Sequence, residues 1–130
     1  MNGETLVALA KEAMMKAYAP YSGYFVGAAL LTKGGKVYTG CNIENAAYGP
    51  TNCAERTAFF KAVSEGERDF AAIAVAGGKA GEITGLFPPC GICRQVMQEF
   101  CGPEFVIYMA KPDGFEAVTL QDLLPYGFGL

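Results

Sequence analysis

The chain has 130 residues and a formal net charge of −3, with 52% hydrophobic and 18% charged residues. This balance disfavours nucleic-acid binding, which needs a basic surface, because the ten Lys and Arg residues are scattered along the chain. The longest uncharged apolar run, 70–78, is too short to cross a bilayer. We therefore expect one domain over residues 1–130, with the surplus apolar surface buried in a homo-oligomer.

The five cysteines bear on where the protein works. An odd number of cysteines, together with an N-terminus that lacks a basic-then-apolar export signal, argues against a disulfide framework. We expect a cytoplasmic protein whose cysteines bind a metal or form a redox pair.

Helical and strand patterns alternate along the chain. In the first half, apolar spacing and turn signals predict a helix over 4–18, a hairpin of strands 24–32 and 36–40, and a loop over 42–50. In the second half, the pattern predicts a helix over 53–63, a buried strand over 70–77, a helix over 90–100, strands over 104–110 and 115–118, and a last helical turn over 120–124. This order indicates an α/β sandwich with a mixed sheet.

Cys90-Gly-Ile-Cys93 is a CxxC motif, which alone could be a redox pair, half of a zinc site or a chance occurrence. A thioredoxin-like pair would closely follow an N-terminal strand, and a structural zinc site would need a fourth protein ligand. Three protein ligands and a water are typical of a catalytic zinc. Cys53 is the candidate third ligand because it and the CxxC motif both lie at predicted helix N-termini, which favour thiolate. The alternative for Cys53 is a small buried hydrophobic side chain. Cys41 and Cys101 have no partner motif and are interpreted as ordinary thiols.

Glu55 allows two interpretations. Asn52 and Glu55 match a helix capping box, in which the glutamate only caps the backbone. Glu55 also lies two residues after a candidate metal ligand, so its carboxylate could reach a metal-activated water and act as a general base. The position beside Cys53 favours the second interpretation.

The segments CNIENAAYGPTNCAERTA (41–58) and PCGICRQVM (89–97) resemble the small, single-domain, homotetrameric cytidine deaminases. Further matches at 17–22, 26–32, 61–66 and 123–125 extend the resemblance over nearly the whole chain. It implies an α/β/α sandwich with a mixed, mostly five-stranded sheet. It also implies zinc-dependent hydrolysis of cytidine and 2′-deoxycytidine to uridine and deoxyuridine plus ammonia, in pyrimidine salvage.

The resemblance also implies a role for individual residues. It makes Cys53, Cys90 and Cys93 the ligands of Zn²⁺, and Glu55 the residue that moves the protons. The backbone N–H of Ala54 is expected to hold the pyrimidine carbonyl oxygen, while Asn42 and Glu44 bind the ribose hydroxyls.

Two aromatic residues and two arginines complete the expected site. Tyr24 stands where the family usually has a phenylalanine that packs on the base, and Phe128 resembles a C-terminal phenylalanine that reaches the base of a neighbouring subunit. Three thiolates give the metal excess negative charge, so Arg56 and Arg94 are expected to donate hydrogen bonds to sulfur. The alternative for each arginine is a solvated surface charge.

Two other functions remain open at this stage. The same fold could deaminate another aminated nucleoside, such as an aminoacyl-nucleoside antibiotic, although the NIEN segment disfavours it. A non-enzymatic zinc-stabilised or redox-sensing protein is a more remote alternative, in which Glu55 is only a cap.

Overall fold

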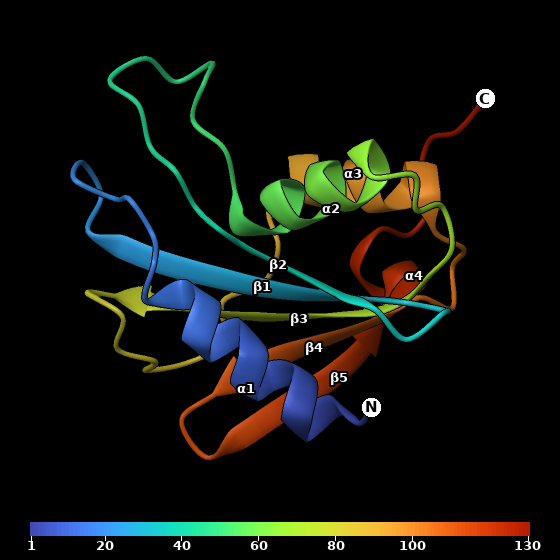
Figure 1. Ribbon diagram of the computed structural model, residues 1–130, viewed down its shortest axis with the longest axis horizontal. Helices are drawn as coiled ribbons and strands as arrows, with labels where there is room; N and C mark the ends of the chain where they lie inside the picture. Colours follow the sequence, from blue (N-terminus) through green and yellow to red (C-terminus); the bar gives the residue numbers. More distant parts are fainter.

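The computed structural model describes residues 1–130 as four helices and five strands (Figure 1). In chain order they are α1 (Gly3–Met14), β1 (Tyr24–Thr32), β2 (Val37–Cys41), α2 (Ala54–Ser64), β3 (Phe70–Lys79), α3 (Gly91–Phe100), β4 (Val106–Lys111), β5 (Gly114–Thr119) and α4 (Leu120–Leu123). The strands form one sheet in the order β2-β1-β3-β4-β5. Only β3 and β4 pair in parallel, so the sheet is mixed.

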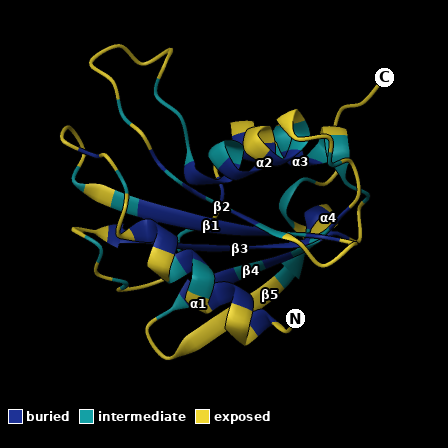
Figure 2. Ribbon diagram, in the orientation of Figure 1, coloured by how far each residue is buried: buried dark blue, intermediate teal, exposed yellow.

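Helices cover both faces of this sheet (Figure 1). Because successive strand residues point to opposite faces, β1 supplies both hydrophobic cores. Val26, Ala28 and Leu30 belong to the core under α2 and α3, whereas Ala29 packs on the α1 side. Figure 2 shows the central strands as largely buried and β5 as the exposed edge. The expected α/β/α sandwich with a five-stranded mixed sheet is therefore confirmed.

The first helix is shorter than its apolar pattern predicts. α1 ends at Met14, not near Tyr18. Tyr18 instead forms a parallel bridge with Ile43, and its backbone N–H donates to the carbonyl of Asn42 at 3.0 Å. A non-local backbone contact thus replaces the last helical turn, and it ties the 15–23 segment to the loop after β2.

Close packing against β2 fixes the N-terminal end of α2. A Cβ atom at Gly40 would lie 2.5 Å from the carbonyl oxygen of Ala54 and 2.7 Å from the backbone nitrogen of Ala58. Only glycine lets the helix backbone approach the strand this closely. The glycine at position 40 therefore determines how close the N-terminal end of α2 lies to β2.

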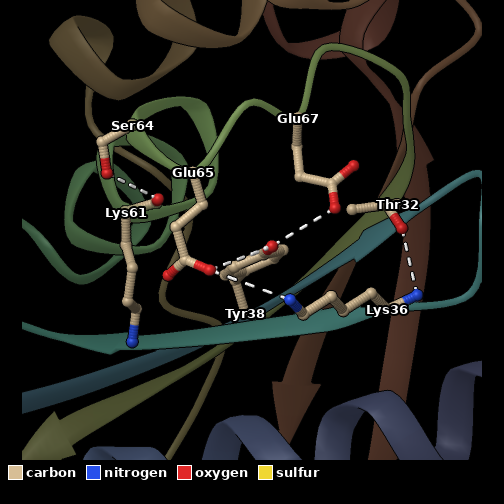
Figure 3. Close-up of polar contacts among 7 residues, drawn as sticks. All are labelled: Thr32, Lys36, Tyr38, Lys61, Ser64, Glu65 and Glu67. Carbon is tan, nitrogen blue, oxygen red and sulfur yellow. Dashed lines mark hydrogen bonds and ion pairs between the residues drawn. The ribbon is translucent and has the colours of Figure 1, made fainter.

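Polar contacts hold the other end of α2 (Figure 3). The hydroxyl of buried Tyr38 in β2 lies 3.2 Å from a carboxylate oxygen of Glu67 and 3.5 Å from one of Glu65. Lys36 forms an ion pair with Glu65 at 3.7 Å, and its ammonium lies 5.0 Å from the centroid of the Tyr38 ring. Both ends of α2 are thus anchored to the same strand.

Candidate active site

Two helix N-termini bring three cysteines together. Cys53 is the N-cap residue of α2, Cys90 is the N-cap residue of α3, and Cys93 lies in the first turn of α3. Neither N-cap side chain makes a capping hydrogen bond, so both thiols are free for other partners. The positive ends of both helices therefore face the sulfur atoms, which favours the thiolate form.

The spacing of the sulfur atoms fits a metal site. All three lie within 4.8 Å of one another, with 3.7 Å between Cys53 and Cys90 and 3.5 Å between Cys90 and Cys93. Tetrahedral zinc with Zn–S bonds of about 2.3 Å separates its sulfur ligands by roughly 3.8 Å. The side chains could hold Zn²⁺ with little movement.

Arg56 contacts this cluster directly. Its Nη2 donates to the sulfur of Cys53 at 3.1 Å. The hydrogen bond with Cys93 and the Arg56 guanidinium lower the pKa of the Cys53 thiol. The side chain of Arg56 therefore places a positive charge where the thiolates need one.

Arg94 is placed differently. Its Nε donates to the carbonyl of Pro89 at 2.7 Å, and its Nη1 donates to the carbonyl of Leu123 at 2.8 Å. The guanidinium thus braces the segment before Cys90 against the end of α4, and these two hydrogen bonds go to carbonyls instead of sulfur.

Glu55 is a buried carboxyl beside the cysteines, with only 4% of its surface exposed. Burial raises the pKa of Glu55 to about 7. A general acid–base residue works best with a pKa near the working pH. The capping-box alternative is wrong, because Cys53 is the N-cap and the Asn52 side chain bonds to the Thr57 hydroxyl at 3.2 Å.

A cavity of about 310 Å³ opens beside Glu55. Its lining includes Glu55 and two of the cysteines, the expected ribose-binding residues, and the first residues of strand β1. It is lined by Ser22, Tyr24, Val26, Asn42, Glu44, Thr51, Asn52, Cys53, Ala54, Glu55, Phe87, Pro88 and Cys90. The size suits one small molecule.

Asn42 and Glu44 are both held by the start of β1 and the segment before it. Asn42 accepts from the backbone N–H of Val26 at 2.9 Å and donates to the carbonyl of Tyr24 at 2.8 Å. One amide hydrogen and one lone pair of Asn42 remain for a ligand. Glu44 accepts from the backbone N–H groups of Tyr21 and Ser22, each at 3.0 Å, and from the Ser22 hydroxyl.

The remaining expected site residues divide into two groups. Tyr24 and Ala54 line the cavity, whereas Phe128 does not line the cavity of its own chain. The side chain of Phe128 is exposed, and its carbonyl accepts from Gln95 at 3.1 Å. Cys41 and Cys101 lie outside the cluster, and burial raises the pKa of the Cys101 thiol to about 12.

Ser22 and Phe87 also line the cavity, and neither is among the site residues that the sequence predicts. Ser22 stands two residues before Tyr24, and Phe87 stands three residues before Cys90. An aromatic side chain so close to a candidate metal ligand was the one available signal for Phe87. No local pattern predicts the contact of Ser22 with Glu44.

Three thiols and a buried glutamate at two helix N-termini, above a mixed sheet, define a zinc-dependent deaminase. The family model for the cytidine and deoxycytidylate deaminase zinc-binding region matches residues 1–109. The chain is 51% identical to the cytidine deaminase of Sporosarcina psychrophila and 50% identical to that of Halalkalibacterium halodurans. Each match covers 98% of this chain, and 92% and 95% of the relatives respectively.

Solved structures agree with these relatives. The crystal structure of cytidine deaminase from Burkholderia pseudomallei matches with a TM-score of 0.91 and 49% identity, covering 98% of this chain and all of that one. The Mycobacterium tuberculosis enzyme matches with a TM-score of 0.83 and 41% identity, covering 100% and 99% of the two chains. The chain belongs to the cytidine deaminase family, as its sequence motifs predict, and its cofactor is zinc. None of its helices combines the length and apolar character of a membrane span.

Proposed function

We propose that this protein hydrolyses cytidine and 2′-deoxycytidine to uridine and deoxyuridine, releasing ammonia, in pyrimidine salvage. The observation that carries the proposal is one cavity that joins a buried glutamate and a three-cysteine cluster to Asn42 and Glu44. A nucleoside needs both ends of such a cavity, since its base reacts while its sugar is bound.

In this proposal Cys53, Cys90 and Cys93 hold the metal. With Zn²⁺ bound, the cluster would supply a Lewis acid that makes a water molecule more acidic. The Arg56 guanidinium, 3.1 Å from the Cys53 sulfur, offsets part of the thiolate charge. Arg94 supports the cluster indirectly, by holding the segment that leads into Cys90.

Glu55 moves the protons. Its carboxylate takes a proton from the attacking water and delivers it to the ring nitrogen beside C4 of the pyrimidine. The water oxygen bonds to C4, and Glu55 then moves the remaining proton of that oxygen to the amino group. The C4–N bond breaks, ammonia leaves and the C4 carbonyl forms, so one carboxylate serves every transfer. Burial suits this role because a pKa of about 7 lets Glu55 accept and release protons near neutral pH.

The other side chains bind and orient the nucleoside. The backbone N–H of Ala54 is proposed to hold the pyrimidine carbonyl oxygen, and Tyr24 to pack against the base. Asn42 and Glu44 are proposed to bind the ribose hydroxyls. The negative charge of Glu44 would also repel a 5′-phosphate, which favours nucleosides over nucleotides.

We further propose that residues 1–130 form one domain and assemble as a cytoplasmic homotetramer with active sites at subunit interfaces. The single sheet with a core on each face supports one domain. Several large apolar side chains are exposed near the cavity and the C-terminus, which supports assembly. They include Tyr18, Tyr21, Tyr48, Ile92, Phe128 and Leu130.

The decisive experiment follows the ultraviolet absorbance of cytidine with the zinc-loaded protein and a Glu55→Ala variant of equal zinc content. We expect conversion to uridine by the wild type and a loss of at least about a thousandfold in the variant, because the residue that moves the protons is gone. Equal activity of both proteins would refute the role of Glu55. Inactivity of both, with zinc bound, would refute cytidine as the substrate.

The same assay separates the two remaining alternatives. A deaminase of an aminoacyl-nucleoside antibiotic would act on that compound in preference to cytidine and deoxycytidine. A non-enzymatic zinc protein would act on none of the three compounds. Its folding would depend on zinc, and Glu55→Gln would cause no loss of any activity.

A further inference from the structure

Two aromatic side chains line the active-site cavity together. Tyr24 comes from β1, and Phe87 comes from the loop that leads into α3. Their ring centroids lie 6.0 Å apart with an angle of 35° between the planes. We call this pair the aromatic wall.

A glycine in β3, Gly77, leaves the space that the Phe87 ring occupies. Gly77 pairs with Val26 in the register of β1 and β3. A Cβ atom at Gly77 would lie 2.8 Å from Cγ of Phe87 and 3.2 Å from Cγ2 of Val26. The ring therefore occupies the space that any other residue at position 77 would fill. Phe87 is a fixed, half-buried side chain that also packs against the main core.

Two residue pairs further along the same two strands, Lys79 contacts Tyr24. Lys79 lies directly opposite Tyr24 in the register, and its ammonium is 5.2 Å from the centroid of the Tyr24 ring. The same ammonium donates to the carbonyl of Ser22 at 3.4 Å. Cross-strand and cation–π contacts of this kind restrict the orientation of an aromatic ring. Both members of the aromatic wall are thus set before any ligand binds.

Phe87 is close in sequence to Cys90, so the aromatic wall lies near the end of the cavity that contains the cysteines and Glu55. Only Pro88 and Pro89 lie between Phe87 and Cys90, so the Cα atoms of Phe87 and Cys90 are at most about 11 Å apart even in a fully extended chain. The pyrimidine atom that reacts is C4, and its two ring neighbours are N3 and C5. The proposed function assigns N3 to Glu55, so the C5 side of the ring remains for the wall.

Resting on that proposed function, we propose that Phe87 is a substrate-binding residue that, with Tyr24, packs against the C5 side of the pyrimidine and limits the size of a 5-substituent. A rigid aromatic surface at this place discriminates by shape. One additional methyl group against such a surface typically changes kcat/KM by about 10- to 200-fold.

The test measures kcat/KM for 5-methylcytidine relative to cytidine. Phe87→Ala should raise this ratio at least about tenfold, because the variant removes the surface that excludes the methyl group. Phe87→Val, which keeps part of the apolar packing, should raise it less and serves if the alanine variant does not fold. Leu86→Ala is the matched control, since Leu86 is exposed on the same loop and does not line the cavity.

A binding measurement separates failure of this inference from failure of the proposed function. Calorimetry on the zinc-loaded proteins compares the Kd of uridine with that of 5-methyluridine, which requires no turnover. Phe87→Ala should favour 5-methyluridine relative to the wild type. An unchanged ratio in the Phe87 variants, or an equal change in Leu86→Ala, would overturn the inference even if cytidine is the substrate. A wild type that turns over no cytidine would refute the proposed function, while the binding ratio would still decide the role of Phe87.

Discussion

Glu44 is held by the chain segment just before β1. Ser22 contacts it twice, through the backbone N–H at 3.0 Å and through the hydroxyl. These hydrogen bonds lower the pKa of the Glu44 carboxyl, and the hydrogen bond from the Ser22 hydroxyl has the largest effect. Ser22 is therefore a positioning residue for the proposed ribose contact, and it keeps the carboxylate charged.

We predict that Ser22→Ala raises KM for cytidine about three- to tenfold with a smaller change in kcat, as for a lost hydrogen bond to a charged group in water. The pKa of Glu44 should rise toward its usual value. Glu44 would then become protonated, and substrate affinity would fall, at a higher pH than in the wild type. Steady-state kinetics between pH 4 and 8 check this, with exposed Ser64→Ala as the control. A fall in kcat alone would contradict the prediction.

Arg56 influences both the cysteines and Glu55. Burial is the main cause of the raised pKa of Glu55, and the Arg56 charge acts in the opposite direction. Removing that charge should raise this pKa further. The carboxylate needed to accept a proton would then be available only at higher pH.

We therefore predict that Arg56→Ala lowers kcat about 10- to 100-fold while zinc is retained at neutral pH. The acid limb of the pH–rate profile should move to higher pH. The measurement is kcat against pH with zinc content determined on the same samples, and Arg68→Ala, beyond the C-terminal end of α2, is the control. An unshifted profile in Arg56→Ala would contradict this role.

At the scale of elements, the position of α2 decides the position of the site. Its N-terminal end rests on Gly40, and its other end is held through Tyr38. Cys53 and Glu55 move with this helix, because they are its N-cap and first-turn residues. The packing of α2 against β2 therefore controls the geometry of the cavity.

Gly40→Ala tests this control. The added Cβ would meet helix backbone at 2.5 Å, so the N-terminal end of α2 must shift. We expect a loss of stability of about 1–3 kcal/mol, as for overpacked cores, and a loss of activity of at least tenfold in the protein that remains folded. Thermal unfolding and kcat/KM measure the two effects. Gly85→Ala, where a Cβ meets open space, should change neither.

The elements themselves were largely predictable, because apolar periodicity and turn residues are local signals. The exceptions depend on distant contacts. α1 ends early since Tyr18 pairs with Ile43, and Cys53 replaces Asn52 as the N-cap of α2. At the site, the CxxC spacing and the position of Glu55 two residues after Cys53 were visible in sequence. The roles of Ser22, Gly77 and Phe87 depend on the sheet register and on a long loop, which local patterns do not encode.

At the scale of the whole molecule, the exposed C-terminal tail bears on the proposed assembly. The proposal that Phe128 reaches a neighbour's base can be tested by mixing two impaired proteins. A Phe128→Ala chain keeps Glu55 but lacks the aromatic ring, whereas a Glu55→Ala chain keeps the ring but lacks the proton carrier. After joint refolding, mixed assemblies should regain part of the wild-type kcat/KM, because each chain supplies what the other lacks. No recovery in assemblies shown by mass to be mixed would contradict a contact between subunits.

The proposed zinc ligands lie on two segments that are separated by all of α2 and β3. The two segments come together only in the folded chain, so zinc binds the folded state in preference to the unfolded state. Free zinc therefore shifts the folding equilibrium toward the folded protein. Above the dissociation constant, each tenfold rise in free zinc should add about 1.4 kcal/mol to the free energy of unfolding. Thermal melts in zinc buffers would show a Tm that climbs steadily with free zinc. In a cell short of the metal, the protein would then be lost to proteolysis together with its activity, and its abundance would follow the zinc supply.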